Sequence, residues 1–328
     1  MPEIAIQSFT DPDAYQSSIR ATDVSVLLTG SGPIRVKLTL MNLHRLWMRS
    51  GESSQSYIMQ GAWTNQRCVV SFLVGDDQTP YHHNGLSLSP GSMLINPLGA
   101  EFYRRSTGRR AGSMSLAPDD LAAAGITLVG RELTAPSATQ VIQPPPQLMS
   151  RLLHLYEAAE HLTETVPDVL DHPEVARAME DALVRAMVAC MAEGNAVGSD
   201  NARARRVPVM QRLERVLDEN RDRPLYLSEI CAAIGVTDRT LRLHCQEVLG
   251  TSPHRYLWLR RMHQVRRALS LTDAAVTTVT QIATDYGFWE LGRFSVAYGR
   301  LFGEAPSATL RRAPDRPVEC RASSPWSL

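Results

Sequence analysis

Two arginines in the last third of the chain, Arg239 and Arg242, have the residue type and spacing for base-specific contacts with nucleic acid. Residues three apart on a helix share a face, so both side chains would project together. A guanidinium fork can donate two hydrogen bonds to O6 and N7 of guanine. The alternative is that these arginines contact phosphates or only solvent. The candidate contact set around them is Thr237, Arg239, Thr240, Arg242, Leu243 and Gln246.

The elements that must position these side chains form a repeated unit. The segments EICAAIGVTDRTLRLHCQEVLGTSP and QIATDYGFWELGRFSVAYGRLFGEAP align on Gly250 and Gly303, with an apolar residue, Leu241 or Phe294, nine positions before each glycine. A small residue, a turn glycine and an apolar anchor in this order are typical of a helix-turn-helix. Two such units in tandem predict a protein that reads DNA.

The second unit offers a different outer face. Helical spacing directs Phe294 and Tyr298 inward and leaves Leu291, Gly292, Ser295 and Val296 as the candidate contacts. These side chains can supply shape, a hydroxyl and contact with thymine methyl groups, but few paired hydrogen bonds. We therefore expect weaker base readout here than in the first unit.

A longer helix, Pro253 to Leu271, is predicted between the two units. About 17 helical residues span about 25 Å. That length can hold two recognition helices near the ~34 Å repeat of the major groove. Its arginines are expected to form a solvated face, with some touching phosphate.

Composition sets broad limits on the class of protein. The 328 residues include 44% apolar and 21% charged side chains with a net charge of zero, so we expect two or three folded domains. Residues 207–312 hold 15 arginines and no lysine against 11 acidic residues, a modest attraction for phosphate. Five dispersed cysteines fit a reducing compartment, and neither a membrane-length apolar run nor a signal peptide is evident. The expected location is the cytoplasm, away from membranes.

The predicted organisation is α+β and multidomain. Residues 1 to about 135 alternate in short apolar–polar runs between turn clusters, which favours a β-sandwich or small barrel. Three prolines at 144–146 precede two amphipathic helices, from about 147 to 193, which either pack on the β-rich part or form a dimerisation surface. A polar linker at 194–206, an all-α region at 207–312 and a flexible tail at 313–328 complete the chain.

A metal or catalytic function finds little support in the sequence. His82 and His83 are adjacent, so on a strand they would face opposite sides and could not both bind one ion. Phosphate-binding loops, dinucleotide fingerprints and nucleophile elbows are missing from the sequence. We expect no metal, no cofactor and no enzymatic activity.

Residues 207–312 resemble the tandem helix-turn-helix domain of the AraC/XylS family of bacterial transcription regulators. The resemblance lies in GVTDRTL with its downstream GTSP, and in IATDYGFWELGRFSVAYGRLFGEAPSATLRR. It implies DNA contact through the exposed residues of both recognition helices. The chain has Leu243, Val296 and Gly299 where family members often carry basic residues. By its layout, the β-rich half, residues 1–193, resembles the family's cupin-like effector-binding domains.

The resemblance implies a sequence-specific transcription regulator, expected to be an activator that binds double-stranded DNA and RNA polymerase and can form a homodimer. A small, largely apolar effector inside the β-rich domain would switch it. The inward-facing positions of the predicted strands, with nearby polar anchors, suggest Arg35, Arg45, Trp47, Trp63 and His82 as effector contacts. The alternatives are a ligand-independent regulator, whose N-terminal half serves dimerisation or protein contacts, and a metal enzyme that carries a DNA-binding module.

Overall fold

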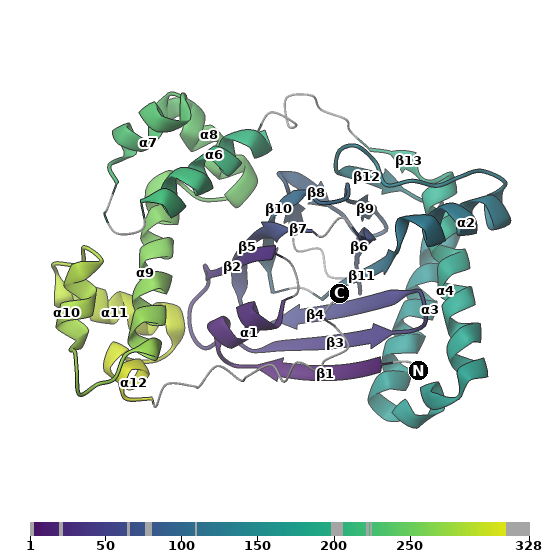
Figure 1. Ribbon diagram of the computed structural model, residues 1–328, viewed down its shortest axis with the longest axis horizontal. Coiled ribbons are helices and arrows are strands. Elements are labelled where there is room, and N and C mark those ends of the chain that lie inside the picture. The colour runs from purple at the N-terminus through teal and green to yellow at the C-terminus, as the bar shows by residue number, and fades with distance from the viewer. Residues whose placement is uncertain are drawn as a thin grey trace.

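The computed structural model describes residues 3–19, 22–63, 66–75, 81–108, 110–197, 206–220, 223 and 225–312. Two β-sheets form its centre, flanked by helices α2–α4 on one side and helices α6–α12 on the other (Figure 1). The predicted tail at 313–328 and most of the predicted linker, residues 198–205, lie outside the described residues.

Among the described residues the strands make two antiparallel sheets, one of eight and one of five strands. The larger sheet runs β1 (Glu3–Phe9), β3 (Val36–Asn42), β4 (Trp47–Ser53), β11 (Ala111–Leu116), β6 (Cys68–Leu73), β9 (Met93–Ile95), β12 (Gln140–Gln143) and β13 (Asn195–Ala196). The smaller sheet runs β2 (Thr22–Leu28), β5 (Ser56–Ala62), β10 (Glu101–Thr107), β7 (Tyr81–His83) and β8 (Leu86–Leu88). The β-rich N-terminal half expected from the alternation is confirmed, and it is a cupin-like barrel or sandwich.

The two faces of the larger sheet have different partners, as strand alternation requires. Met48, Phe72 and Met114 lie in one core with helices α2 (Pro118–Val129), α3 (Pro146–Thr165) and α4 (Pro173–Glu193). Leu73 and Leu94 point the other way and form a cluster with Tyr81 of the smaller sheet. The second face of the larger sheet therefore looks into the space between the sheets.

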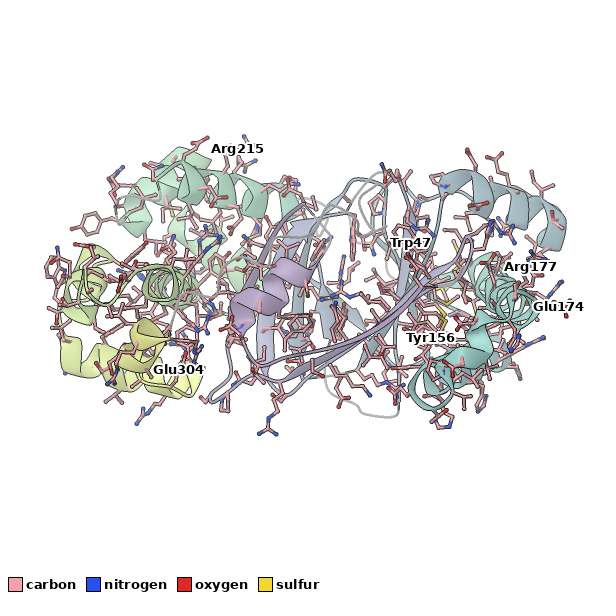
Figure 2. The ribbon with its side chains drawn as sticks, turned by 60° about the horizontal axis from the view of Figure 1, so that its bottom comes forward. Trp47, Tyr156, Glu174, Arg177, Arg215 and Glu304 are labelled. Carbon is pink, nitrogen blue, oxygen red and sulfur yellow. The ribbon has the colours of Figure 1, made fainter. Side chains whose placement is uncertain are left out.

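The two long helices predicted after the prolines are present and bury one face on the larger sheet. On α3, Leu152 and Tyr156 are fully buried, and Tyr156 Oη donates a hydrogen bond of 2.6 Å to the Arg49 carbonyl of β4 (Figure 2). A short 3₁₀ helix, η1 (Pro167–Asp171), joins α3 to α4. The apolar faces of α3 and α4 thus pack on the β-rich part, which is one of the two alternatives that the sequence left open.

The C-terminal helices follow the predicted tandem arrangement. After α6 (Arg206–Glu219), the first unit comprises α7 (Leu227–Ile234) and α8 (Asp238–Leu249), and the second comprises α10 (Val279–Asp285) and α11 (Leu291–Phe302). Helix α9 (Pro253–Leu271) connects the units, with the bounds expected from the sequence, and α12 (Pro306–Arg311) follows. Gly235 ends α7 with φ +70°, a left-handed conformation that favours glycine over other residues.

The smaller sheet packs its outer face against these helices. Leu27, Ile58 and Tyr103 share a core with buried residues of α6–α9, among them Met210 and Tyr256. Helix α1 (Pro12–Ser18) of the β-rich half lies close to this junction (Figure 1). The barrel and the helix-turn-helix units are therefore in direct contact. Within the described part of the chain, none of the helices combines the length and apolar character needed to span a membrane.

Candidate nucleic-acid interface

Helix α8 presents the predicted polar face to solvent. Thr237 caps the helix, because its hydroxyl accepts a hydrogen bond of 3.2 Å from the Thr240 amide. Leu241, Cys245 and Val248 are buried beneath it. The opposite face exposes Arg239, Arg242, Leu243 and Gln246, while Thr240 is half-buried. The first unit therefore carries its candidate contacts on one open helical face.

The two arginines of this face have different surroundings. Arg242 Nε lies 2.9 Å from Asp238 Oδ2, one turn earlier, and both side chains are about half exposed. Within the described residues, Arg239 takes part in no ion pair. Arg239 can thus reach a base or phosphate without breaking a contact, whereas Arg242 must share or release Asp238.

Helix α11 exposes Gly292, Ser295 and Val296, and Leu291 is half-buried at its start. Arg293, which was not among the predicted contacts, is 85% exposed and pairs with Glu290 at 2.8 Å. Helical spacing could have identified Arg293 as a candidate contact, because Arg293 and Arg300 lie seven residues apart and flank Val296. The expectation of a donor-poor face is corrected: Arg293 and Arg300 border the same cleft as Gly292 and Val296.

That cleft, about 520 Å³ in volume, also touches the N-terminal half. Gly30 and Ser31, from the turn after β2, line it together with Trp258 of α9. The Gly32 amide donates a hydrogen bond of 2.7 Å to the Arg300 carbonyl of α11. A Cβ on Gly303 would lie 2.6 Å from the Pro33 nitrogen, so the close approach requires glycine there. The second recognition helix is therefore held at one end by the β-rich half.

Helix α9 is anchored to the β-rich half by buried polar contacts. Arg266 is 3% exposed and pairs with Asp11 and Asp13, which lie at the start of α1. Burial acts to raise the pKa of Asp11, but the Arg266 charge and hydrogen bond hold it below its ordinary value. One turn earlier, His263 Nε2 accepts a hydrogen bond of 2.8 Å from the Leu28 amide. Burial, and then the Arg266 charge, lower the pKa of His263 to about 3, so this ring is neutral.

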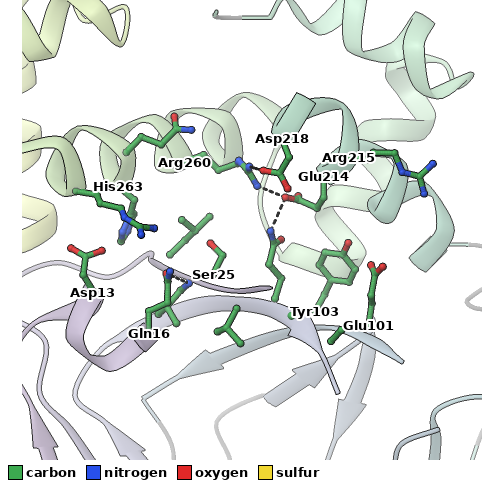
Figure 3. A pocket seen from close by; sticks show the side chains of 18 of the residues that line it. Asp13, Gln16, Ser25, Glu101, Tyr103, Glu214, Arg215, Asp218, Arg260 and His263 are labelled. Carbon is green, nitrogen blue, oxygen red and sulfur yellow. Dashed lines mark hydrogen bonds and ion pairs between the residues drawn. The ribbon is translucent and has the colours of Figure 1, made fainter. Parts of the chain in front are cut away.

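A second polar network joins the smaller sheet to α6 and α9 (Figure 3). Glu214 accepts hydrogen bonds from Tyr256 Oη at 2.6 Å and from Gln60 Nε2 at 2.7 Å. It also pairs with Arg260, whose other nitrogen lies 2.9 Å from Asp218. This network borders a cleft of about 1040 Å³ between the sheet and the helices. Arg260 thus has two carboxylate partners within the protein.

The structure does not bring together the five residues expected to contact an effector. Arg35 is exposed at the edge of the β-rich half. Arg45 points to α4, where its Nε lies 3.0 Å from Glu180 Oε1. Burial acts to raise the pKa of Glu180, but hydrogen bonds from Arg45 and Leu46 lower it below its ordinary value. These contacts hold Arg45 on the helical side of the larger sheet.

The other three are also dispersed. Trp47 lies on β4 with the Arg67 guanidinium 4.0 Å from its ring centroid. His82 is on the side of β7 opposite to His83, and its Nδ1 lies 3.3 Å from the Ser87 hydroxyl. Trp63 stacks on Phe102 of β10, with ring centroids 4.6 Å apart, and its buried Nε1 has no hydrogen-bond partner among the described residues. Of the five, Trp63 has a buried polar atom still available to a ligand.

Comparisons with known proteins agree with the repeated units. A helix-turn-helix domain model matches residues 230–312. The chain is 33% identical over 121 residues to the XylDLEGF operon transcriptional activator 2 of Pseudomonas putida, covering 37% of this chain and 77% of that protein. It is 32% identical over 163 residues to the probable thc operon regulatory protein of Rhodococcus erythropolis, covering 47% of this chain and 49% of that protein. The chain thus spans about half the length of the Rhodococcus relative.

Among solved structures, the crystal structure of the AraC-like transcriptional activator CuxR is similar with a TM-score of 0.42. It has 15% sequence identity and covers 79% of this chain and 94% of that one. The identity across most of the Pseudomonas relative and the tandem units of α7–α8 and α10–α11 lead to one conclusion. The chain belongs to the AraC/XylS family.

Proposed function

We propose that the protein is a transcriptional activator whose hold on double-stranded DNA is switched by a small molecule bound between its two sheets. The open face of α8 reads bases through Arg239 and Arg242, with Thr237, Thr240, Leu243 and Gln246 beside them. On α11, Leu291, Gly292, Ser295 and Val296 contact the groove, and Arg293 adds a phosphate contact. This division follows from exposure, since these side chains lie on the accessible faces of the two helices, apart from the half-buried Thr240 and Leu291.

The observation that supports the proposed switch is that the five-stranded sheet contacts both the interior of the barrel and the C-terminal helices. The inner face of the five-stranded sheet lines the barrel, and its outer face packs on α6–α9 through Leu27, Ile58 and Tyr103. A ligand that shifts these strands must also shift the helices packed on them. Such a ligand changes DNA affinity by its difference in affinity for the two arrangements.

The activator assignment rests on the Pseudomonas relative, which is described as an operon activator. An activator acts through RNA polymerase, so we include that enzyme among the partners. A homodimer on two neighbouring half-sites also fits the proposal. The alternative function is a ligand-independent regulator in which the β-rich half serves dimerisation or protein contacts.

For the division of the chain we propose an effector-binding and dimerisation domain at 1–193, a linker at 194–206, a DNA-binding domain at 207–312 and a tail at 313–328. The fragment 201–316 should then fold and bind DNA at low salt, with an affinity that falls steeply as salt rises. Failure to shift any DNA from the region near its own gene would contradict this division.

The test of the switch is a thermal-shift screen of small metabolites on the full-length protein, followed by DNA binding with each hit. We expect at least one compound to raise the melting temperature and to change DNA affinity. The Trp63→Ala variant should lose this response and keep basal DNA binding. If the screen gave no hit, the ligand-independent alternative would replace the switch.

A further inference from the structure

The beginning of α9 borders the surface that α11 exposes. Helix α11 lies beside α9 (Figure 1), and both helices line the cleft of about 520 Å³. The residues that α11 contributes recur at helical spacing and share one side of the helix: Gly292, Arg293, Val296, Ala297, Arg300 and Leu301. Two of these, Gly292 and Val296, are also proposed groove contacts. The cleft therefore runs along the edge of the face that would enter the groove.

Arg255 is the charged residue that α9 contributes to this cleft. Its guanidinium carbon lies 4.0 Å from the centroid of the Trp258 ring, which belongs to the next turn of the same helix. An arginine stacked on an indole keeps its flat face on the ring and its N–H donors at the edge. A phosphate can accept such donors in pairs. Trp258 thus holds Arg255 in a position from which it can donate to an anion.

The arginines of this cleft have few carboxylate partners within the described part of the chain. Among these residues, Arg255 and Arg300 take part in no ion pair, and Arg293 has a single carboxylate partner. Partial burial lowers the pKa of Arg255 from its ordinary value, so the cost of removing its charge from water is not fully offset by other groups. On another side of α9, Arg260 and Arg266 each pair with at least two acidic residues. The cleft side of α9 therefore favours an anion from outside the chain.

A helix in the major groove lies between two phosphate backbones. The helix with its side chains is about 10–12 Å across and the groove is about 12 Å wide, so a cation beside the helix meets a phosphate. Arg255 lies beside α11 in this way, because the cleft between them includes Gly292 and Val296. Gly30 and Ser31 of the β-rich half also border the cleft, and they bring no charge that would oppose a phosphate.

We propose that α9 is a third DNA-contacting element, in which Arg255, positioned by Trp258, binds a backbone phosphate of the strand that runs beside α11. This inference rests on the proposed insertion of α11 into the major groove. Only residues 250–252 separate α8 from α9, so a phosphate contact at the start of α9 fixes the register of both units on the duplex. Of the α9 arginines, Arg255 is the one with its donors directed to this cleft, since Arg260 and Arg266 are held by carboxylates.

The test is a salt titration of the DNA affinity of the full-length protein, on a duplex selected from a random pool and on a random duplex. Arg255→Gln should weaken binding to both about 3- to 10-fold and reduce the slope of log affinity against log salt by about 0.9, the loss of one phosphate contact. Arg255→Lys should keep the slope, because it keeps the charge. Arg267→Gln, at an exposed arginine on another side of α9, should change neither quantity.

A double-mutant cycle tests the positioning role of Trp258. Trp258→Leu should weaken binding about 2- to 5-fold in the wild-type protein, because Arg255 loses the ring that directs it. In the Arg255→Gln background the same change should cause no further loss. An equal loss in both backgrounds would mean that Trp258 acts independently of Arg255, and would overturn this part of the proposal.

Two results with Arg255→Gln would overturn the phosphate contact. One is an unchanged salt slope, and the other is a loss confined to the selected duplex, which would make Arg255 a base contact. A fall in melting temperature of more than about 5 °C would also overturn it, since Arg255 would then support the fold. In each case a loss of specific binding in Arg239→Ala would leave the proposed DNA reader intact, whereas a wild-type protein that bound neither duplex would contradict the proposed function itself.

Discussion

The two recognition helices of this protein have the same layout but different surroundings. Helix α8 exposes Arg239 and Arg242 on an open face, and its buried side rests on the smaller sheet. Helix α11 exposes Arg293 beside small and apolar residues, and its far end is held by the turn at Gly32. The comparison suggests a division of labour. In the proposed division, the first unit reads bases and the β-rich half governs the position of the second.

The largest effect should follow from breaking the contacts of Arg266 that anchor α9 to the β-rich half. Arg266→Met leaves the partly buried Asp13 without its ion-pair partner and Asp11 with Arg312 alone, so we expect a loss of about 3 kcal/mol in the free energy of unfolding. Denaturant unfolding of the full-length protein measures it. The neighbouring Arg267→Met, at an exposed position, should cost little. Equal losses from both changes would remove Arg266 as the anchor.

The next effect concerns the open face of the first unit. Arg239→Ala should cost about 1–3 kcal/mol in binding to the specific site and much less on random DNA, because it removes paired hydrogen bonds to a base. Arg242→Ala should cost somewhat less, since Asp238 already shares its charge. Fluorescence anisotropy with specific and random duplexes measures both. A loss of the same size on random DNA would make Arg239 a phosphate contact.

The sequence predicted the local features of this comparison well. Helical periodicity correctly placed Phe294 and Tyr298 inward, and α9 has the predicted ends. The β-rich character of residues 1 to about 135 was also predicted. Such features are encoded within one turn or one strand, so nearby residues suffice to predict them.

Contacts between distant segments were not predictable in the same way. The Arg266 anchor joins residues more than 250 positions apart, and no local pattern announces it. Arg45 was expected to face an effector, but Glu180, 135 residues later, attracts it to α4. The position of Arg255 beside α11 depends on how the second unit packs against α9. Spacing along the chain did not reveal that packing.

Acidification should weaken the junction between the β-rich half and α9. The pKa of His263 is about 3 in the folded protein, below its ordinary value of 6.5, because of burial and then Arg266. Between these values the unfolded chain takes up a proton that the folded protein does not. Stability is therefore present above pH 6.5 and falls as the pH drops, at up to about 1.4 kcal/mol per pH unit for this residue.

His83, between the sheets, has a pKa lowered to about 3, chiefly by burial and by Arg104, and adds the same trend. His263→Gln keeps an acceptor for the Leu28 amide and should reduce the slope measured by unfolding at several pH values. His154→Gln, at an exposed position of α3, is the control. An unchanged slope in His263→Gln would show that this ring is not the titrating group.

The smallest effects are expected on the second helix. Arg293→Ala should weaken binding by about 0.5–1 kcal/mol on all sequences and reduce the salt dependence by about one phosphate contact. Ser295→Ala should cost less still. Salt titrations of DNA affinity measure both changes. A larger loss in Ser295→Ala than in Arg239→Ala would reverse the ranking of the two readers.

Selection from a random DNA pool tests most directly whether the first unit selects the bases. The wild-type protein should enrich a motif containing guanine at a fixed position. Arg239→Ala should lose the preference at one base pair of that motif, whereas Arg293→Ala should enrich the wild-type motif more weakly. If Arg239→Ala enriched the same motif unchanged and Arg293→Ala altered it, the second unit would be the reader and the account would be contradicted.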